Sequence, residues 1–240
     1  MKKSFAIILT LLVLFIYSIS AADSSFYLKA AYLCSYDTNV YSNPMVRNAS
    51  ASWLNWRVEN PYIKRMNNGL HLEGDVFFKK DARTGLSISL DLGYPFMATE
   101  FIPEGNFSGE WEYASKDVLD TQNPRVFLGI GPTFRYQHDN FDFGANIRLS
   151  VGSYDLFDDN YDDDIILGIM AEPYVNMFIN DEMFVTAAVH YDAHLMSFYV
   201  NNPNKYFVEN YTMLTFGGYI GLGFSFDKPE AEEATIEETK

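Results

Sequence analysis

Apolar and polar residues alternate along this chain with a period of two over long stretches. In a β-strand, successive side chains point to opposite faces, so each stretch predicts a strand with one apolar face. The apolar faces of eight such stretches span residues 26–34, 70–78, 86–94, 126–136, 141–151, 165–177, 183–195 and 214–226. None of these faces carries a charged residue, whereas the opposite faces hold glycine, hydroxyl, amide and charged side chains.

Strand length and connection length distinguish a membrane barrel from a soluble sheet, which also alternates. Most of the stretches cover ten or more residues, whereas strands of soluble proteins cluster near five or six and a tilted membrane strand needs about 9–11. Short connections alternate with long ones: 80–83, 138–140 and 180–182 against 35–68, 95–124, 154–164 and 199–210. Short periplasmic turns and long extracellular loops alternate in this way in outer-membrane barrels.

Aromatic residues also favour a membrane barrel. The chain contains 20 Phe and 17 Tyr, and aromatic girdles mark both membrane interfaces of such barrels. The aromatics on the apolar faces gather near strand ends, at Tyr32, Phe78, Tyr94, Phe134, Tyr136, Phe141, Phe143, Phe224 and Phe226. The alternative is a lipocalin-like soluble barrel with its apolar face turned inward.

The sequence therefore predicts an all-β protein: an eight-stranded antiparallel up-and-down transmembrane β-barrel over residues 23–226. Two further segments leave the strand number open. Residues 53–58 could form a short strand or helical turn, and residues 107–113 alternate and could extend the second long loop as a hairpin above the membrane. Counting both as spanning would give ten strands.

The two ends of the chain predict export and a short tail. Two lysines, an apolar run at residues 5–17 and small residues at 20–22 form the pattern of a signal peptide, so we expect residues 1–22 to be removed. An uncleaved anchor is the alternative, but the run is shorter than the roughly 20 residues that span a bilayer. Residues 227–240 are acidic and predict a disordered periplasmic tail. The formal net charge of −15 argues against a nucleic-acid partner.

Residues 25–226 resemble the small outer-membrane barrels typified by the membrane domain of OmpA, OmpX and OmpW. The most specific element is the closing strand, residues 219–226 (YIGLGFSF), which looks like the C-terminal assembly signal of such proteins. The resemblance implies a cell outer membrane location and recognition by the barrel assembly machinery through Phe224 and Phe226. This chain continues past that strand, but residues 227–240 are too few for a peptidoglycan-binding domain, so that role is not implied.

The polar faces should point into the barrel and fill it. An eight-stranded barrel has an interior just wide enough for side chains, and buried charges there must pair. We expect Arg148 to pair with Glu172 or Asp91. The full set of expected interior ionisable residues is Glu73, Asp75, Asp91, Asp142, Glu172, Asp192, Lys29, Lys79, Arg125, Arg135, Arg148, His71, His190 and His194.

His190, Asp192 and His194 are the residues closest to a reactive pattern, because their spacing places all three on one face of a strand. They could hold zinc or take part in acid–base chemistry on lipid. No serine partner can be placed beside them, and histidines within a polar plug are the favoured interpretation. We therefore assign no catalytic, cofactor-binding or metal-ligating residue.

The function predicted is that of a non-enzymatic outer-membrane barrel with a plugged polar lumen and surface loops serving structure or adhesion. A channel for small solutes, as OmpW-like proteins are thought to be, and a barrel enzyme acting on outer-membrane lipid are the alternatives. The expected partners are outer-membrane lipid, the barrel assembly machinery and a host or surface ligand.

Overall fold

The computed structural model describes residues 24–41, 62–79, 81–105, 111–154, 164–199 and 213–227. Within these ranges the chain consists almost entirely of antiparallel strands, with one short 3-10 helix, η2 (Leu119–Thr121). No helix in this part of the chain is long and apolar enough to cross a membrane. The strands are β1 (Ser25–Tyr41), β2 (Tyr62–Phe77), β3 (Thr84–Gly105), β4 (Trp111–Asp117), β5 (Arg125–His138), β6 (Phe141–Ser153), β7 (Asp164–Phe178), β8 (Met183–Tyr199) and β9 (Met213–Asp227).

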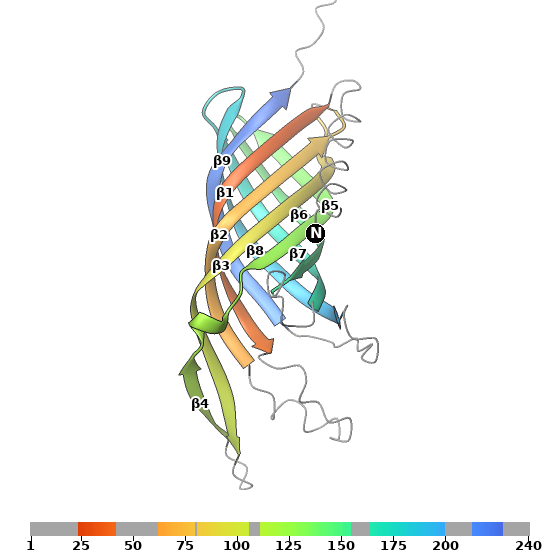
Figure 1. The fold of residues 1–240 in the computed structure, drawn as a ribbon. Helices are drawn as coiled ribbons and strands as arrows, with labels where there is room; N and C mark the ends of the chain where they lie inside the picture. The colour runs from red at the N-terminus through yellow and green to blue at the C-terminus, as the bar shows by residue number, and fades with distance from the viewer. Residues whose placement is uncertain are drawn as a thin grey trace, which may run out of the picture.

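Eight of these strands form a closed ring. The order β2-β1-β9-β8-β7-β6-β5-β3 closes through the pairing of β2 with β3 (Figure 1). Closure gives every strand two neighbours and leaves the ring without an open edge, which a structure in lipid requires. Each of the eight predicted stretches falls on one strand of this ring to within a residue, so the predicted eight-stranded barrel is confirmed.

The ninth strand, β4, lies outside the ring. It pairs only with the end of β3, over Thr99–Gly105, and the resulting hairpin extends beyond the barrel in Figure 1. Residues 111–113 therefore lie in a hairpin outside the ring, as predicted, whereas residues 107–110 lie outside the described residues. The other ambiguous segment, residues 53–58, lies outside the described residues. Among the described strands, none adds to the eight that span.

The barrel has two ends that differ in their connections. At the short-turn end, strands are joined by residues 78–83, 139–140 and 179–182, and the start of β1 pairs with the end of β9. At the opposite end, here called the long-connection end, the connections include residues 42–61, 106–124, 154–163 and 200–212. Asp139 has φ 51° in the two-residue turn, a conformation that Asp tolerates better than most residues. Several strands continue past their predicted limits, most clearly β1, β2 and β3.

The two faces of the barrel have opposite polarity. Outward side chains are exposed and apolar, as in Leu149 at 67% and Ile220 at 60%, whereas inward side chains such as Arg148 and Glu172 are buried. All nine predicted girdle aromatics are exposed. The apolar face therefore points outward, the reverse of a lipocalin-like barrel, and forms the surface that a membrane-spanning barrel presents to lipid.

Candidate functional site

The barrel interior is the candidate site, because polar side chains from all eight ring strands meet there. Seven carboxylates, five Lys or Arg and three His are buried among the described residues. The prediction was correct for every expected interior residue except Lys79, which lies exposed at the short-turn end. The buried set comprises Lys29, Asp37, Arg65, His71, Glu73, Asp75, Asp91, Arg125, Arg135, Asp142, Arg148, Glu172, His190, Asp192 and His194.

Half-way along the barrel, ion pairs form between neighbouring strands and, between Arg148 and Glu73, across the lumen. Lys29 Nζ lies 2.5 Å from Glu73 Oε1 and 2.7 Å from Asp75 Oδ2. Arg148 Nη2 lies 2.5 Å from Glu73 Oε2, and Arg148 Nη1 contacts Glu172 Oε2. Arg148 thus links β2 to β7 through the lumen, which confirms its predicted pairing with Glu172. We call this group the central ion cluster; it contains Lys29, His71, Glu73, Asp75, Asp91, Arg148, Glu172 and His190.

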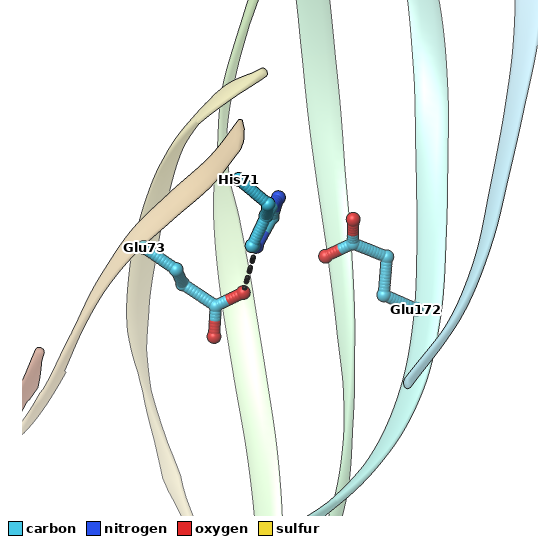
Figure 2. A group of neighbouring side chains, drawn as sticks. All are labelled: His71, Glu73 and Glu172. Atoms are coloured by element: carbon cyan, nitrogen blue, oxygen red, sulfur yellow. Dashed lines mark hydrogen bonds and ion pairs between the residues drawn. The ribbon is translucent and has the colours of Figure 1, made fainter. Parts of the chain in front are cut away.

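His71 is held from several sides within this cluster. Its Nδ1 lies 2.5 Å from Asp91 Oδ1 and its Nε2 lies 3.0 Å from Glu73 Oε2. The imidazole ring also stacks on Tyr219, with ring centroids 4.0 Å apart. Figure 2 shows His71 and Glu73 on one wall and the carboxylate of Glu172 pointing toward them from another. Both ring nitrogens of His71 therefore already have partners.

Nearer the long-connection end lies a second group, here called the outer polar cluster: Asp37, Arg65, Asn67, Arg125 and Thr215. Asp37 Oδ2 accepts from Arg65 Nε at 2.9 Å and from Asn67 Nδ2 at 2.8 Å. Asp37 Oδ1 accepts from Arg125 Nη1 and Thr215 Oγ1, each at 2.8 Å. Four side chains from three strands, β2, β5 and β9, thus converge on one buried carboxylate of β1.

Asp37 and Arg65 were not predicted to lie in the interior, because both fall in a segment assigned to the first long loop. The signal that could have found them is the continued alternation through Ser35, Asp37, Arg65 and Asn67, all of which are buried. Polar residues such as Lys64 share the outward face there, so the apolar–polar contrast that marked the strands disappears.

An aromatic layer lies in the interior at the short-turn end. Tyr27, Phe77 and Phe184 are buried together, and Phe178 packs against them. The ring of Tyr27 lies 5.5 Å from Phe77, 6.0 Å from Phe178 and 5.3 Å from Phe184, centroid to centroid. The Arg135 guanidinium lies 3.7 Å from the centroid of Phe77, and its Nη1 donates to Tyr27 Oη at 2.7 Å. At this end the interior therefore holds packed aromatic rings together with the Arg135 guanidinium.

The three residues at alternate positions of β8 all point inward, as predicted, but they do not form one site. His190 Nδ1 bonds Glu172 Oε1 at 2.7 Å in the central ion cluster. His194 lies further along, with Nε2 3.2 Å from Thr215 Oγ1, and Asp192 lies between the two. Among the described residues, two groups have ligating atoms mutually within 4.8 Å: one is His71, Glu73 and Glu172, and the other is Asp91, Glu172 and His190.

The barrel is similar to solved structures of outer-membrane proteins. AlkL, determined by solid-state NMR in DMPC lipid bilayers, gives a TM-score of 0.52 at 9% identity, covering 89% of this chain and 96% of AlkL. Neisserial surface protein A gives 0.47 at 10% identity, covering 85% of this chain and all of that one. OprG from Pseudomonas aeruginosa gives 0.46 at 10% identity, covering 88% and 99%.

No protein-family model and no curated protein matches the sequence. The structural likeness therefore bears on the fold. It is the fold of the small outer-membrane barrels, as the resemblance of residues 25–226 indicated. With its apolar outer face, this fold places the protein in the outer membrane.

Proposed function

We propose that this outer-membrane barrel is a non-enzymatic, non-conducting protein whose lumen is closed by its own side chains, and whose long-connection end serves surface structure or adhesion. The observation that carries the proposal is the pairing of Arg148 with Glu73 and Glu172, all at 0% side-chain exposure. An ion crossing the barrel would have to separate these charges in a medium where unpaired charge is costly. The aromatic layer would then block its exit.

Absence of transport can be tested with liposomes. Vesicles carrying the purified, folded protein and loaded with a small fluorescent anion or cation should retain either dye as long as protein-free vesicles do. A general porin in matched vesicles is the positive control. Rapid loss of either dye from vesicles with this barrel would favour the channel alternative.

The non-enzymatic part of the proposal is supported by the way the acid–base groups are used. His71 and His190 hold buried carboxylates at the centre of the barrel, away from the outer face that meets lipid. Incubation of the folded barrel with outer-membrane lipid extract, followed by mass spectrometry, should give no deacylated or acylated product. New lipid species that disappear in a His71→Gln variant would establish the enzyme alternative.

Surface structure or adhesion is supported by the asymmetry of the two ends. In outer-membrane barrels the longer connections face the exterior, and here that end also carries the β3–β4 hairpin (Figure 1). The proposed partners are a host or surface ligand at this end, outer-membrane lipid around the belt, and the assembly machinery at Phe224 and Phe226, whose rings are exposed. Cells expressing a chain without residues 106–110 should adhere less to the ligand surface than wild-type cells at equal barrel abundance. Equal adhesion would remove the hairpin from the proposal.

A further inference from the structure

His71 faces a carboxylate with each of its two ring nitrogens. Nδ1 lies 2.5 Å from Asp91 Oδ1, and Nε2 lies 3.0 Å from Glu73 Oε2. A neutral imidazole has one N–H donor and one acceptor nitrogen, whereas an imidazolium has two donors. An ionised carboxylate can only accept. If both carboxylates are ionised, the ring must therefore carry two protons.

Glu73 is ionised, because donors surround both of its oxygens. Lys29 Nζ lies 2.5 Å from Oε1, and Asn146 Nδ2 lies 3.1 Å from the same atom. Arg148 Nη2 lies 2.5 Å from Oε2, which also accepts from Tyr219 Oη at 3.1 Å. Charged donors of this kind bond most strongly to a charged acceptor. The proton shared between Oε2 and the neighbouring imidazole therefore lies on the imidazole.

A second proton lies between His71 and Asp91. In water an imidazole binds a proton roughly 400-fold more tightly than an aspartate carboxylate. The carboxylate of Glu172 points toward the ring of His71 (Figure 2), with an oxygen within 4.8 Å of a ring nitrogen, and it favours positive charge there. The ring also stacks on Tyr219 at 4.0 Å between centroids, and the face of a tyrosine attracts a cation. A protonated Asp91 that donates to a neutral ring is the alternative.

The charge of the central ion cluster also requires a further cation. Among the described residues of this cluster, four are carboxylates and two are Lys or Arg, so two negative charges lack a lysine or arginine. Uncompensated buried charge is costly, and a second proton on the imidazole supplies one of the missing positive charges. The titratable and charged groups around it are Lys29 on β1, Glu73 and Asp75 on β2, Asp91 on β3, Arg148 on β6, Glu172 on β7, His190 on β8 and Tyr219 on β9.

We propose that His71 is an imidazolium, the third cation of the central ion cluster, and that its second proton locks the closed lumen. The inference concerns the regulation of the lumen and rests on the closed lumen proposed above. Loss of this proton would remove a donor and a positive charge from between two buried carboxylates, Asp91 and Glu73. The side chains that fill the lumen should therefore hold together less strongly as the solution becomes alkaline.

Nuclear magnetic resonance of the folded wild-type barrel reads the protonation state directly. The chain is labelled with nitrogen-15 and carbon-13 and studied in detergent micelles at about pH 7.5, and the ring nitrogens of His71 are assigned through bonds from its backbone. Both nitrogens should give the signals of protonated nitrogen. The urea-unfolded chain is the reference, because its histidines are mostly neutral at this pH. An unprotonated ring nitrogen on His71 in the folded barrel would overturn the proposal, and this result needs no variant.

The pH dependence of stability is the second measurement. If the folded chain holds a proton that the unfolded chain has released, folding binds that proton and stability falls as the pH rises. One such proton lowers the folding equilibrium constant about tenfold per pH unit. Urea unfolding of the wild-type barrel in lipid vesicles, followed by far-ultraviolet circular dichroism, should show a fall of about tenfold or more between about pH 7.5 and 8.5. An unchanged equilibrium constant would contradict the lock.

A matched variant and the conductance complete the test. His138→Gln changes a histidine at the end of β5 whose side chain is 67% exposed, and it should show the same pH dependence as wild type. A smaller fall in this variant would assign the linked proton to His138 and contradict the proposal. Conductance at the same pH tests the closed lumen separately. A steady current would overturn the closed lumen and its lock together, whereas a neutral His71 in a non-conducting barrel would overturn the lock alone.

Discussion

Asp37 Oδ1 lies 2.8 Å from Arg125 Nη1, so a side chain of β1 meets a side chain of β5 through the barrel lumen. These two strands are not neighbours in the ring, and both side chains are completely buried. The contact therefore connects two strands that share no backbone pairing, and it stabilises the barrel across its lumen. It also occupies the lumen near the long-connection end.

Removing one side of this contact should destabilise the barrel strongly. Arg125→Ala would leave Asp37 with Arg65 as its only ion-pair partner among the described residues, and breaking a buried pair from one side costs about 3–5 kcal/mol. Urea unfolding in lipid vesicles, followed by far-ultraviolet circular dichroism of the β-strands, measures this loss. Arg83→Ala, at an exposed arginine of the short-turn end, is the control and should change stability by less than about 0.5 kcal/mol.

The double variant Arg125→Ala/Asp37→Ala separates pairing from simple truncation. Because the two side chains interact directly, the cost of the double variant should be smaller than the sum of the single costs. Additive costs would show that the pair contributes nothing beyond its separate contacts.

A charged side chain on the outer face should lower the free energy of unfolding. Ile220 is 60% exposed near the middle of β9, and an arginine at the bilayer midplane of a barrel costs about 2–4 kcal/mol. Ile220→Arg should lose that much stability in the same unfolding assay. Ser115→Arg, at an exposed position on the β4 hairpin, should cost almost nothing, and equal losses at the two sites would contradict the placement of the membrane.

The eight strands and their faces could be predicted because the bilayer imposes a strong contrast on each strand. Within the membrane, one face must be apolar and the other can be polar, as at Phe143 and Asp142. Beyond the membrane this contrast is lost, so the ends of β1 and β2, with Asp37 and Arg65, were assigned to a loop. Lys79 was wrongly placed in the interior at the other end of the barrel. The alternation was extended two residues past Phe77, where β2 ends.

The contacts inside the barrel were only partly predictable. Arg148 and Glu172 lie on adjacent strands, and their pairing could be inferred from sequence distance to the turns. The contact of Arg125 with Asp37 crosses the lumen, so it depends on the tilt and relative shift of all eight strands. The approach of Asp91 Oδ2 to within 3.9 Å of His190 Nε2, between β3 and β8, depends on the same closure. Alternation along one strand carries no information about either contact.

Labelling of single cysteines should distinguish the two ends of the barrel. In a Cys34→Ser background, Lys116→Cys on β4 should react with a membrane-impermeant maleimide on intact cells, because the long-connection end faces outward. Asp181→Cys at the short-turn end should react only after the outer membrane is permeabilised. Both positions are exposed, so a reversed pattern would show that the barrel is inserted the other way.

The β5–β6 turn should tolerate glycine and resist a branched side chain. Asp139 has φ 51°, where glycine has no steric penalty and an ordinary side chain costs about 1–2 kcal/mol. Asp139→Gly should therefore keep or slightly raise the free energy of unfolding, whereas Asp139→Val should lower it by about that amount. Identical stability of the two variants would show that this conformation is not required.

The closed lumen is tested most directly by the electrical conductance of the purified, folded wild-type barrel in a planar lipid bilayer. We expect no steady current at either polarity, because paired charges and the aromatic layer fill the interior. Arg148→Ala should be less stable but still non-conducting, since Tyr27, Phe77 and Phe184 remain packed together at the short-turn end, where we propose that they close the lumen. A steady, voltage-proportional current through the wild-type protein, scaling with the number of inserted barrels, would contradict the closed lumen and establish a channel.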